Sequence, residues 1–201
     1  AYIGRKIAEH YARFPAPEAL AEELASAFSR TGGDMREVLM AAVRHPDFWA
    51  TRPGGRAMQP PEFAFRLARC VRSTDAGAVH EFLNLSGHGM FDRSTPDGYQ
   101  EGDDEVIDSN AMLQRWKFAR RLERPLIELL PAELRTGSTP LTDEEAQAAV
   151  DLLAMRLTGR LLGPASNRAA LDLLGRTEGK REDRVKVLAV FVASSPEVQV
   201  K

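Results

Sequence analysis

The sequence predicts an all-α fold, an irregular or orthogonal bundle of about eight or nine helices with one long acidic loop. Almost every periodic stretch places apolar residues three or four positions apart, which is the repeat of a helix. No segment alternates β-branched or aromatic residues with polar ones, as a half-buried strand does. The connections between periodic stretches are short, as they are between packed helices, except from residue 86 to residue 108.

Proline, glycine and capping residues set the bounds of the first five helices. Pro17 opens the second helix, and Gly32-Gly33 stops it. Asp34 is suited to cap the third helix, with Glu37 three residues later to complete a capping box. The five helices are expected at residues 2–13, 17–30, 35–45, 61–71 and 75–85.

The second half of the chain carries the same signals. Thr142 is suited to cap a long helix, and Pro164 opens the next one. Pro46 and Pro196 each stand at the first position of a new turn that follows a helix. Helices are expected at residues 109–122, 142–162, 164–174 and 182–193, with a short helical turn at 126–130.

Composition excludes several classes of protein. Lys and Arg number 27 and Asp and Glu number 29, so no basic field exists to hold nucleic acid. A balance of 43% hydrophobic and 28% charged residues is typical of folded globular proteins. The longest apolar run, Val187 to Ala193, is far shorter than the roughly 20 residues of a membrane helix, so no membrane insertion is expected.

The single cysteine, Cys70, excludes an internal disulfide and a thiolate metal cage. It lies on the apolar stripe of the helix expected at 61–71, so we expect a buried, inert thiol.

The length of 201 residues suits a single helical domain, 1–201. The alternative is two helical halves, 1–86 and 109–201, joined by loop 87–108. Because the chain opens on Ala1 and is in a helical pattern by Tyr2, we expect it to be a fragment of a longer protein.

The loop holds seven acidic residues between positions 92 and 108. Calcium takes about six to eight oxygen ligands on flexible backbone, which clustered carboxylates can supply. Counting from Asp97 puts Gly102 at position six and Asp108 at position twelve, as in an EF-hand, but Tyr99 occupies position three, where a ligand is needed. Either this is a solvated acidic loop, or Ca²⁺ is its cofactor. The candidate metal ligands are Asp97, Glu101, Asp103 and Asp108.

The same loop supplies the candidate binding residues, His88, Asp97 and Tyr99. Pro96-Asp97-Gly98 is the strongest turn signal in the chain and holds Tyr99 in a fixed place, either packed on the helices or lining a ligand surface. His88 lies between two glycines, but the histidine spacing is not that of a zinc site. No catalytic motif is present, because Leu85-Ser86-Gly87 lacks the strand and glycine spacing of a nucleophile elbow.

A run of basic residues between Arg115 and Arg124 is interleaved with Trp116. Such a run can stack nucleic-acid bases, but a solvated helix face explains it better. In this interpretation Trp116 and Leu113 lie on the buried stripe of the helix, and Trp116 contacts Arg120 one turn later.

An ordered series of short segments covers essentially the whole chain, beginning with Ile3, Arg5 and Lys6. The others are Thr31–Arg36, His45–Trp49, Gln59–Phe63, Ser94–Tyr99, Leu113–Ala119 and Ala193–Gln199. This series resembles the C-terminal portion of the bacterial domain-of-unknown-function family 1800. The chain departs from the family pattern after Tyr99, where Val106-Ile107 replaces a usual Trp.

The resemblance implies a longer parent protein, often exported or periplasmic and often encoded beside a second exported, sulfatase-like family. It implies no activity. The first functional hypothesis is therefore a non-catalytic helical assembly or partner-binding domain of an exported bacterial protein, whose partner is another exported protein. The second is part of an enzyme, or a cation or substrate site, built on the acidic loop 92–108.

Overall fold

A computed structural model describes residues 2–13, 15–50, 56–93, 96, 98–99 and 106–200. Over these residues the chain forms thirteen helices, nine of them with seven or more residues, and no strand. One isolated antiparallel bridge pairs Ala57 with Val200. The predicted all-α fold is confirmed.

The helices form two compact units, each described here by itself. Ala1–Ala57 and Val200–Lys201 make up the N-terminal unit, and Met58–Gln199 the larger unit. The division falls beside Ala57 and not in the 87–108 segment. That the chain is one folding domain stays a prediction.

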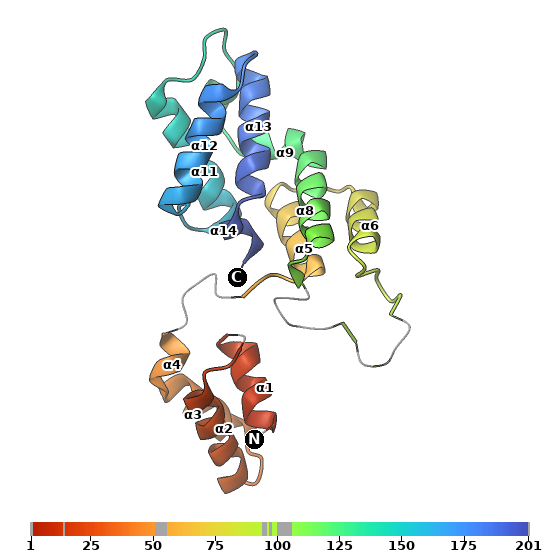
Figure 1. Ribbon diagram of the computed structural model, residues 1–201, viewed down its shortest axis with the longest axis vertical. Helices are drawn as coiled ribbons and strands as arrows, with labels where there is room; N and C mark the ends of the chain where they lie inside the picture. The colour runs from red at the N-terminus through yellow and green to blue at the C-terminus, as the bar shows by residue number, and fades with distance from the viewer. Residues whose placement is uncertain are drawn as a thin grey trace. The chain divides into compact units, whose positions relative to one another are not determined.

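The N-terminal unit contains four helices around a small core (Figure 1). They are α1 (Tyr2–Tyr11), α2 (Glu18–Arg30), α3 (Met35–Arg44) and the single turn α4 (Pro46–Trp49). Leu20, Leu24 and Val38 are fully buried between them. Gly4 brings α1 against the α2 backbone so closely that a methyl group there would overlap Ala21 and Ala25.

The predicted cap of α3 is confirmed. One carboxylate oxygen of Asp34 accepts hydrogen bonds from the backbone N–H groups of Arg36, at 2.9 Å, and Glu37, at 3.4 Å. The structure shows no return bond from the Glu37 side chain, so the expected capping box is half formed.

The larger unit contains the other nine helices. In chain order they are α5 (Pro60–Cys70), α6 (Ala76–Leu85), α8 (Ser109–Arg121), α9 (Glu123–Ile127), α10 (Ala132–Arg135), α11 (Asp143–Thr158), α12 (Pro164–Arg176), α13 (Arg181–Ala193) and α14 (Pro196–Gln199). The expected long helix at 142–162 ends early, at Thr158, because Gly159 adopts a left-handed φ of 73° and closes it. The turn α10 has no counterpart among the predicted elements.

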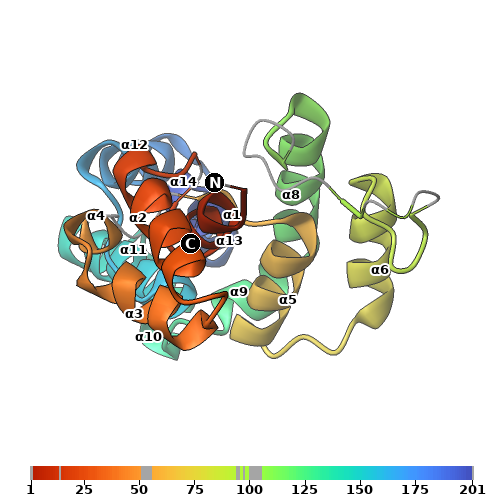
Figure 2. The same cartoon turned by 90° about the horizontal axis from the view of Figure 1, so that it is seen from below.

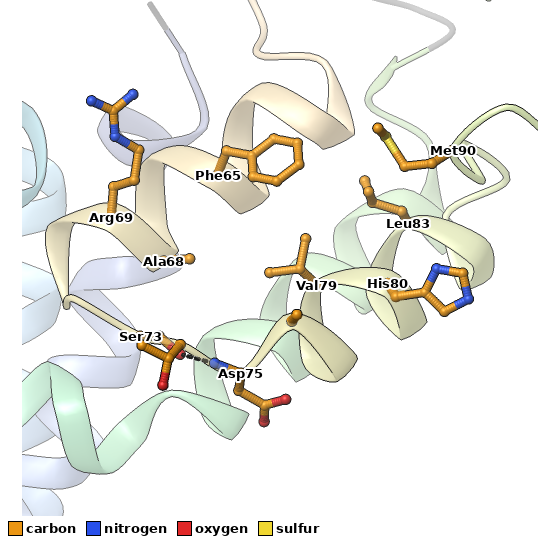
Figure 3. Close-up of a pocket in the computed structure, with 11 residues that line it drawn as sticks. Phe65, Ala68, Arg69, Ser73, Asp75, Val79, His80, Leu83 and Met90 are labelled. Atoms are coloured by element: carbon orange, nitrogen blue, oxygen red, sulfur yellow. Dashed lines mark hydrogen bonds between the residues drawn. The ribbon is translucent and has the colours of Figure 1, made fainter.

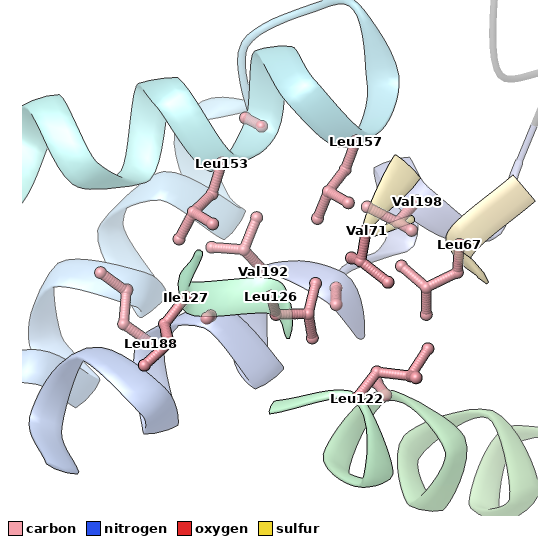
Figure 4. Packing of buried hydrophobic residues seen from close by; sticks show 14 of the residues in the cluster. Leu67, Val71, Leu122, Leu126, Ile127, Leu153, Leu157, Leu188, Val192 and Val198 are labelled. Carbon is pink, nitrogen blue, oxygen red and sulfur yellow. The ribbon is translucent and has the colours of Figure 1, made fainter. Parts of the chain in front are cut away.

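Helix α13 lies at the centre of the larger unit and packs against α8, α9, α10, α11 and α12. Eight of its thirteen residues are apolar, and Val185, Leu188 and Val192 are fully buried. Figure 4 shows Leu188 and Val192 meeting Leu153 of α11 and Ile127 of α9 in one continuous apolar cluster. The apolar run read from the sequence thus forms the central helix of a core.

Helix α6 lies at the edge of the same unit (Figure 2). Six of its ten residues are Ala, Val, Phe or Leu, yet it packs mainly against two neighbours, α5 and α8. Phe82 faces inward and contacts Phe63 of α5 and Phe118 of α8, with ring centroids 5.8 and 4.9 Å apart. The rest of its apolar surface is therefore left without a covering helix in the described part of the chain.

The two ends of the larger unit meet. The backbone N–H of Met58 donates to the carbonyl oxygen of Gln199 at 2.8 Å. Arg115 of α8 is fully buried beside this contact, where its guanidinium donates to Met58 O and, at 3.0 Å, to Gln199 Oε1. It also lies 5.0 Å from the ring centre of Phe63. Desolvation lowers the pKa of Arg115 to about 10, although the charge of Glu62 acts in the opposite direction.

Candidate functional site

The described residues form an apolar pocket of about 370 Å³ between α5 and α6 (Figure 3). Figure 3 shows Phe65 on α5 and Val79 on α6 facing the space between the two helices, with Met90 at one end. The lining residues are Phe65, Ala68, Arg69, Ser73, Thr74, Asp75, Ala76, Val79, His80, Leu83 and Met90. A volume of this size lies within the usual range for binding pockets in proteins.

The helical repeat explains why α5 presents these residues. Pro60 opens the helix, and a capping box between Gln59 and Glu62 fixes its start. Phe63 and Leu67 turn into the core. Residues 65, 68 and 69 therefore share another face, which looks toward α6.

The start of α6 is fixed by Asp75, whose carboxylate accepts the backbone N–H of Ala78 at 2.8 Å. That hydrogen bond is the main reason why the pKa of Asp75 lies below its ordinary value, and Arg121 of α8, 3.3 Å away, adds to the effect. Arg121 also pairs with Glu81 at 2.5 Å. The one carboxylate that lines the pocket is thus already occupied by a helix end and a cation.

The turn between the helices has an unusual backbone. Ser73 N–H donates to Ala68 O at 2.8 Å and Arg72 N–H donates to Arg69 O at 3.1 Å, the two bonds of a Schellman motif. This motif puts Arg72 in the left-handed region, with φ of 52°, at a position where glycine is usual. An arginine at this position therefore strains the backbone, which a glycine would not do.

The segment after α6 closes the other end of the pocket. His88 and Tyr99 stack with ring centroids 4.5 Å apart, and the Tyr99 hydroxyl donates to Gly89 O at 2.9 Å. The guanidinium of Arg93 lies 5.4 Å from the centre of the Tyr99 ring. These contacts fold the segment onto itself beside Met90, which lines the pocket.

Two of the three candidate binding residues, His88 and Tyr99, are thus brought together, and they hold a loop that borders the pocket. Neither lines it. Phe91 follows Met90 with a φ of 62° and a side chain that is 99% exposed. In the described residues, Arg72 and Phe91 are the two non-glycine positions with positive φ; Arg72 lies in the turn that ends α5, and Phe91 in the segment after α6.

The predicted cation site is only partly described. Asp97, Glu101 and Asp103 lie outside the described residues. Asp108 caps α8, accepting the backbone N–H of Ala111 at 2.6 Å. Among the residues that the structure describes, no three His, Cys, Asp or Glu side chains gather as a metal site would require. The Ca²⁺ site stays a prediction.

Three side chains lie elsewhere than the sequence analysis placed them. Trp116 and Leu113 are half-exposed, and Arg115 occupies the buried stripe in their place. The expected Trp116–Arg120 contact is not formed; arginine stacks on an aromatic ring of this helix bundle through Arg115 and Phe63. Cys70 is half-buried, because it lies at the last turn of α5, at the margin of the core.

The sequence alone does not predict the α5–α6 pocket. Its residues come from three separate segments, and single exposed apolar side chains are common on protein surfaces. The signal available in the sequence was the apolar character of residues 76–85 on both sides of the helix.

No helix in the described part of the chain combines the length and apolar character needed to cross a membrane. No curated protein and no solved structure matches the chain. The model of one family, described as protein of unknown function (DUF1800), matches residues 1–200. Since that match covers nearly the whole sequence, the chain belongs to the DUF1800 family.

Proposed function

We propose that this chain is a non-catalytic helical module that binds a partner protein through the α5–α6 pocket. One observation carries the proposal: an apolar helix, α6, stands at the edge of its unit and borders an apolar pocket of about 370 Å³. An apolar helix is normally covered on most sides, because each exposed apolar side chain forgoes its transfer free energy.

The surroundings of the pocket favour a protein partner. Phe65 and Met90 are each about half-exposed at its margin, and Leu85 is exposed on the far side of α6. A second, smaller hollow of about 160 Å³ lies there, between α6 and α8. Contiguous apolar patches with hollows that can take single side chains are typical of protein interaction surfaces.

The setting of this binding is part of the proposal. Resemblance to a family of bacterial and often exported proteins supports an exported parent chain. The partner would then be another exported protein, encountered in the periplasm or outside the cell.

The test fills the pocket. Ala76 is exposed, lines the pocket and is the first residue of α6, so Ala76→Trp places an indole over the cavity without disturbing the core. Ala132→Trp is the matched control, since Ala132 is also exposed and also begins a helix, α10. A library of random dodecapeptides displayed on phage is selected on the whole chain.

We expect selected peptides to bind the natural chain and the Ala132→Trp variant, and to lose at least tenfold in affinity for the Ala76→Trp variant. Circular dichroism and thermal melting confirm that both variants fold. If every selected peptide binds the two variants equally well, the pocket is not a binding site for protein segments.

A further inference from the structure

We propose that the partner segment is acidic: it places an apolar side chain in the α5–α6 pocket and carboxylates against Arg69 and Arg72. This inference rests on the proposed function and specifies the chemistry of the partner. It concerns two arginines whose guanidinium groups form no ion pair with the described residues.

The charges around the pocket are unbalanced. Arg69 lines the pocket, and Arg72 follows it by one turn. Within the described residues, neither guanidinium has a carboxylate within ion-pair distance. Asp75, which caps α6, and Glu81, within α6, both pair with Arg121 instead. Arg69 thus offers an uncompensated positive charge in the lining of the pocket, and Arg72 offers a second one in the turn directly before Ser73, another lining residue.

The backbone of Arg72 is the second observation. Glycine at this position would relieve the strain that a left-handed φ imposes on an L-residue. Because Arg72 is exposed, its side chain makes no packing contribution to the core that would offset this strain. Strained residues persist at binding sites more than elsewhere, and this one lies between two residues of the site, Arg69 and Ser73.

Phe91, in the segment after α6, is a second residue that combines a left-handed backbone with an exposed side chain. Its φ is also left-handed, and its ring is almost completely exposed to solvent. It follows Met90, which lines the pocket. A bound segment that reaches past Met90 could therefore use an exposed aromatic ring beside the pocket as well as the arginines.

An anionic membrane surface is the other acidic partner that two arginines could contact. Recognition of anionic lipids usually takes a cluster of about four to eight basic residues. The chain has a net charge of −2, and the described residues place one unpaired cation, Arg69, in the lining of the pocket and another, Arg72, in the adjoining turn. A short acidic segment matches that charge, and the largely apolar lining of the pocket can hold its apolar side chain.

The experiment uses the peptides selected from the phage library that lose binding to Ala76→Trp. We expect their sequences to combine Leu, Phe or Met with Asp or Glu within one or two helical turns. Arg69→Gln with Arg72→Gln should weaken their binding about fivefold, and raising the salt concentration to 1 M should reproduce most of that loss. Arg168→Gln with Arg176→Gln, on the exposed side of α12, is the matched control and should change nothing.

Arg72→Gly separates binding from folding. We expect this variant to melt about 2–4 °C higher, because the strain is relieved, and to bind the peptides more weakly. A variant that binds less well because it is unfolded would melt lower instead.

Four results would overturn the inference. The pocket-dependent peptides could lack acidic residues or bind the double Gln variant with unchanged affinity, which would leave the proposed function standing. Phosphatidylglycerol vesicles could bind through Arg69 and Arg72 while acidic peptides do not. If no selected peptide depends on the pocket, the proposed function fails first.

Discussion

Helices α13 and α6 are both largely apolar, but neighbouring helices cover α13 more completely than they cover α6. Five neighbouring helices cover α13, so its apolar residues form the centre of the core. Among the described helices, α6 packs mainly against α5 and α8, and its remaining apolar surface borders two hollows. An apolar helix at the centre contributes stability, whereas an apolar helix at an edge contributes a surface. The same composition therefore serves packing in one place and, in the proposed function, binding of a partner in the other.

The sharpest way to test this contrast is to remove side chains from both helices. Leu188→Ala in α13 should lower the free energy of unfolding by about 3 kcal/mol, because a fully buried leucine leaves a cavity. Val79→Ala, at the half-buried wall of the pocket, should cost less than about 1 kcal/mol. Denaturant titration followed by circular dichroism measures both values. Equal losses would mean that α6 is as much a part of the core as α13.

Arg115 tests whether the junction of α5, α8 and α14 belongs to the core. Arg115→Ala should destabilise the chain by about 2 kcal/mol, since it leaves Met58 O and Gln199 Oε1 buried without a donor. Relief of the desolvated charge offsets part of the loss. Arg120→Ala on the exposed face of the same helix should stay within about 0.5 kcal/mol. A result in which the two variants match would remove Arg115 from the structural account.

Glu197 of α14 links the C-terminal helix to the start of α12, and its contribution to the stability of the fold depends on pH. Its carboxylate accepts the backbone N–H of Gly163 at 2.8 Å. Burial raises the pKa of Glu197, but the hydrogen bonds outweigh it, so the pKa lies below its ordinary value of 4.5. A depressed pKa stabilises the fold above that value, and the stabilisation is lost as pH falls through the lower, folded-state pKa.

Glu197→Gln should accordingly cost about 1 kcal/mol or less at pH 7, with the difference from the natural chain shrinking below pH 4. Thermal melting at a series of pH values follows the two proteins in parallel. A difference that grows toward acid pH would contradict the assigned direction.

The smallest effect is expected at the edge. Tyr99→Phe removes the hydroxyl that donates to Gly89 O but keeps the ring stacked on His88. Global stability should change by less than about 0.5 kcal/mol. Amide hydrogen exchange at residues 88–90 should quicken, because the segment beside the pocket loses one tether. Unchanged exchange would show that the stacked ring alone holds the segment.

The sequence predicts the helices well because their signals are local. Pro17, Asp34 and Thr142 start helices through contacts within four residues, and the structure places helix starts beside all three. The buried face of a helix depends on its neighbours. In α8, the stripe of Leu113 and Trp116 is more hydrophobic, yet Arg115 lies inward with Ala111 and Phe118 because α5 and α14 meet that side.

The candidate site was less predictable for the same reason. His88 and Tyr99 were identified through local turn chemistry, and they do meet. The pocket is formed by α5, α6 and Met90, and no local sequence pattern indicates that these three segments lie side by side. Arg72 carried no signal at all, since an arginine after a helix looks ordinary until its φ is known.

The hydrogen bond between Met58 and Gln199 has a topological consequence. Residues 141 positions apart close the larger unit into a ring along the chain. Closing so long a loop is entropically costly, so this contact should form late in refolding, after α11–α13 have assembled from nearer neighbours. Because Met58 and Gln199 are adjacent, a short linker could join these two ends of the larger unit. New chain ends could then be opened in the connection between α12 and α13. Such a circular permutant would consist of residues 58–199 without the N-terminal unit, and recovery of its helical content would show that the larger unit folds by itself.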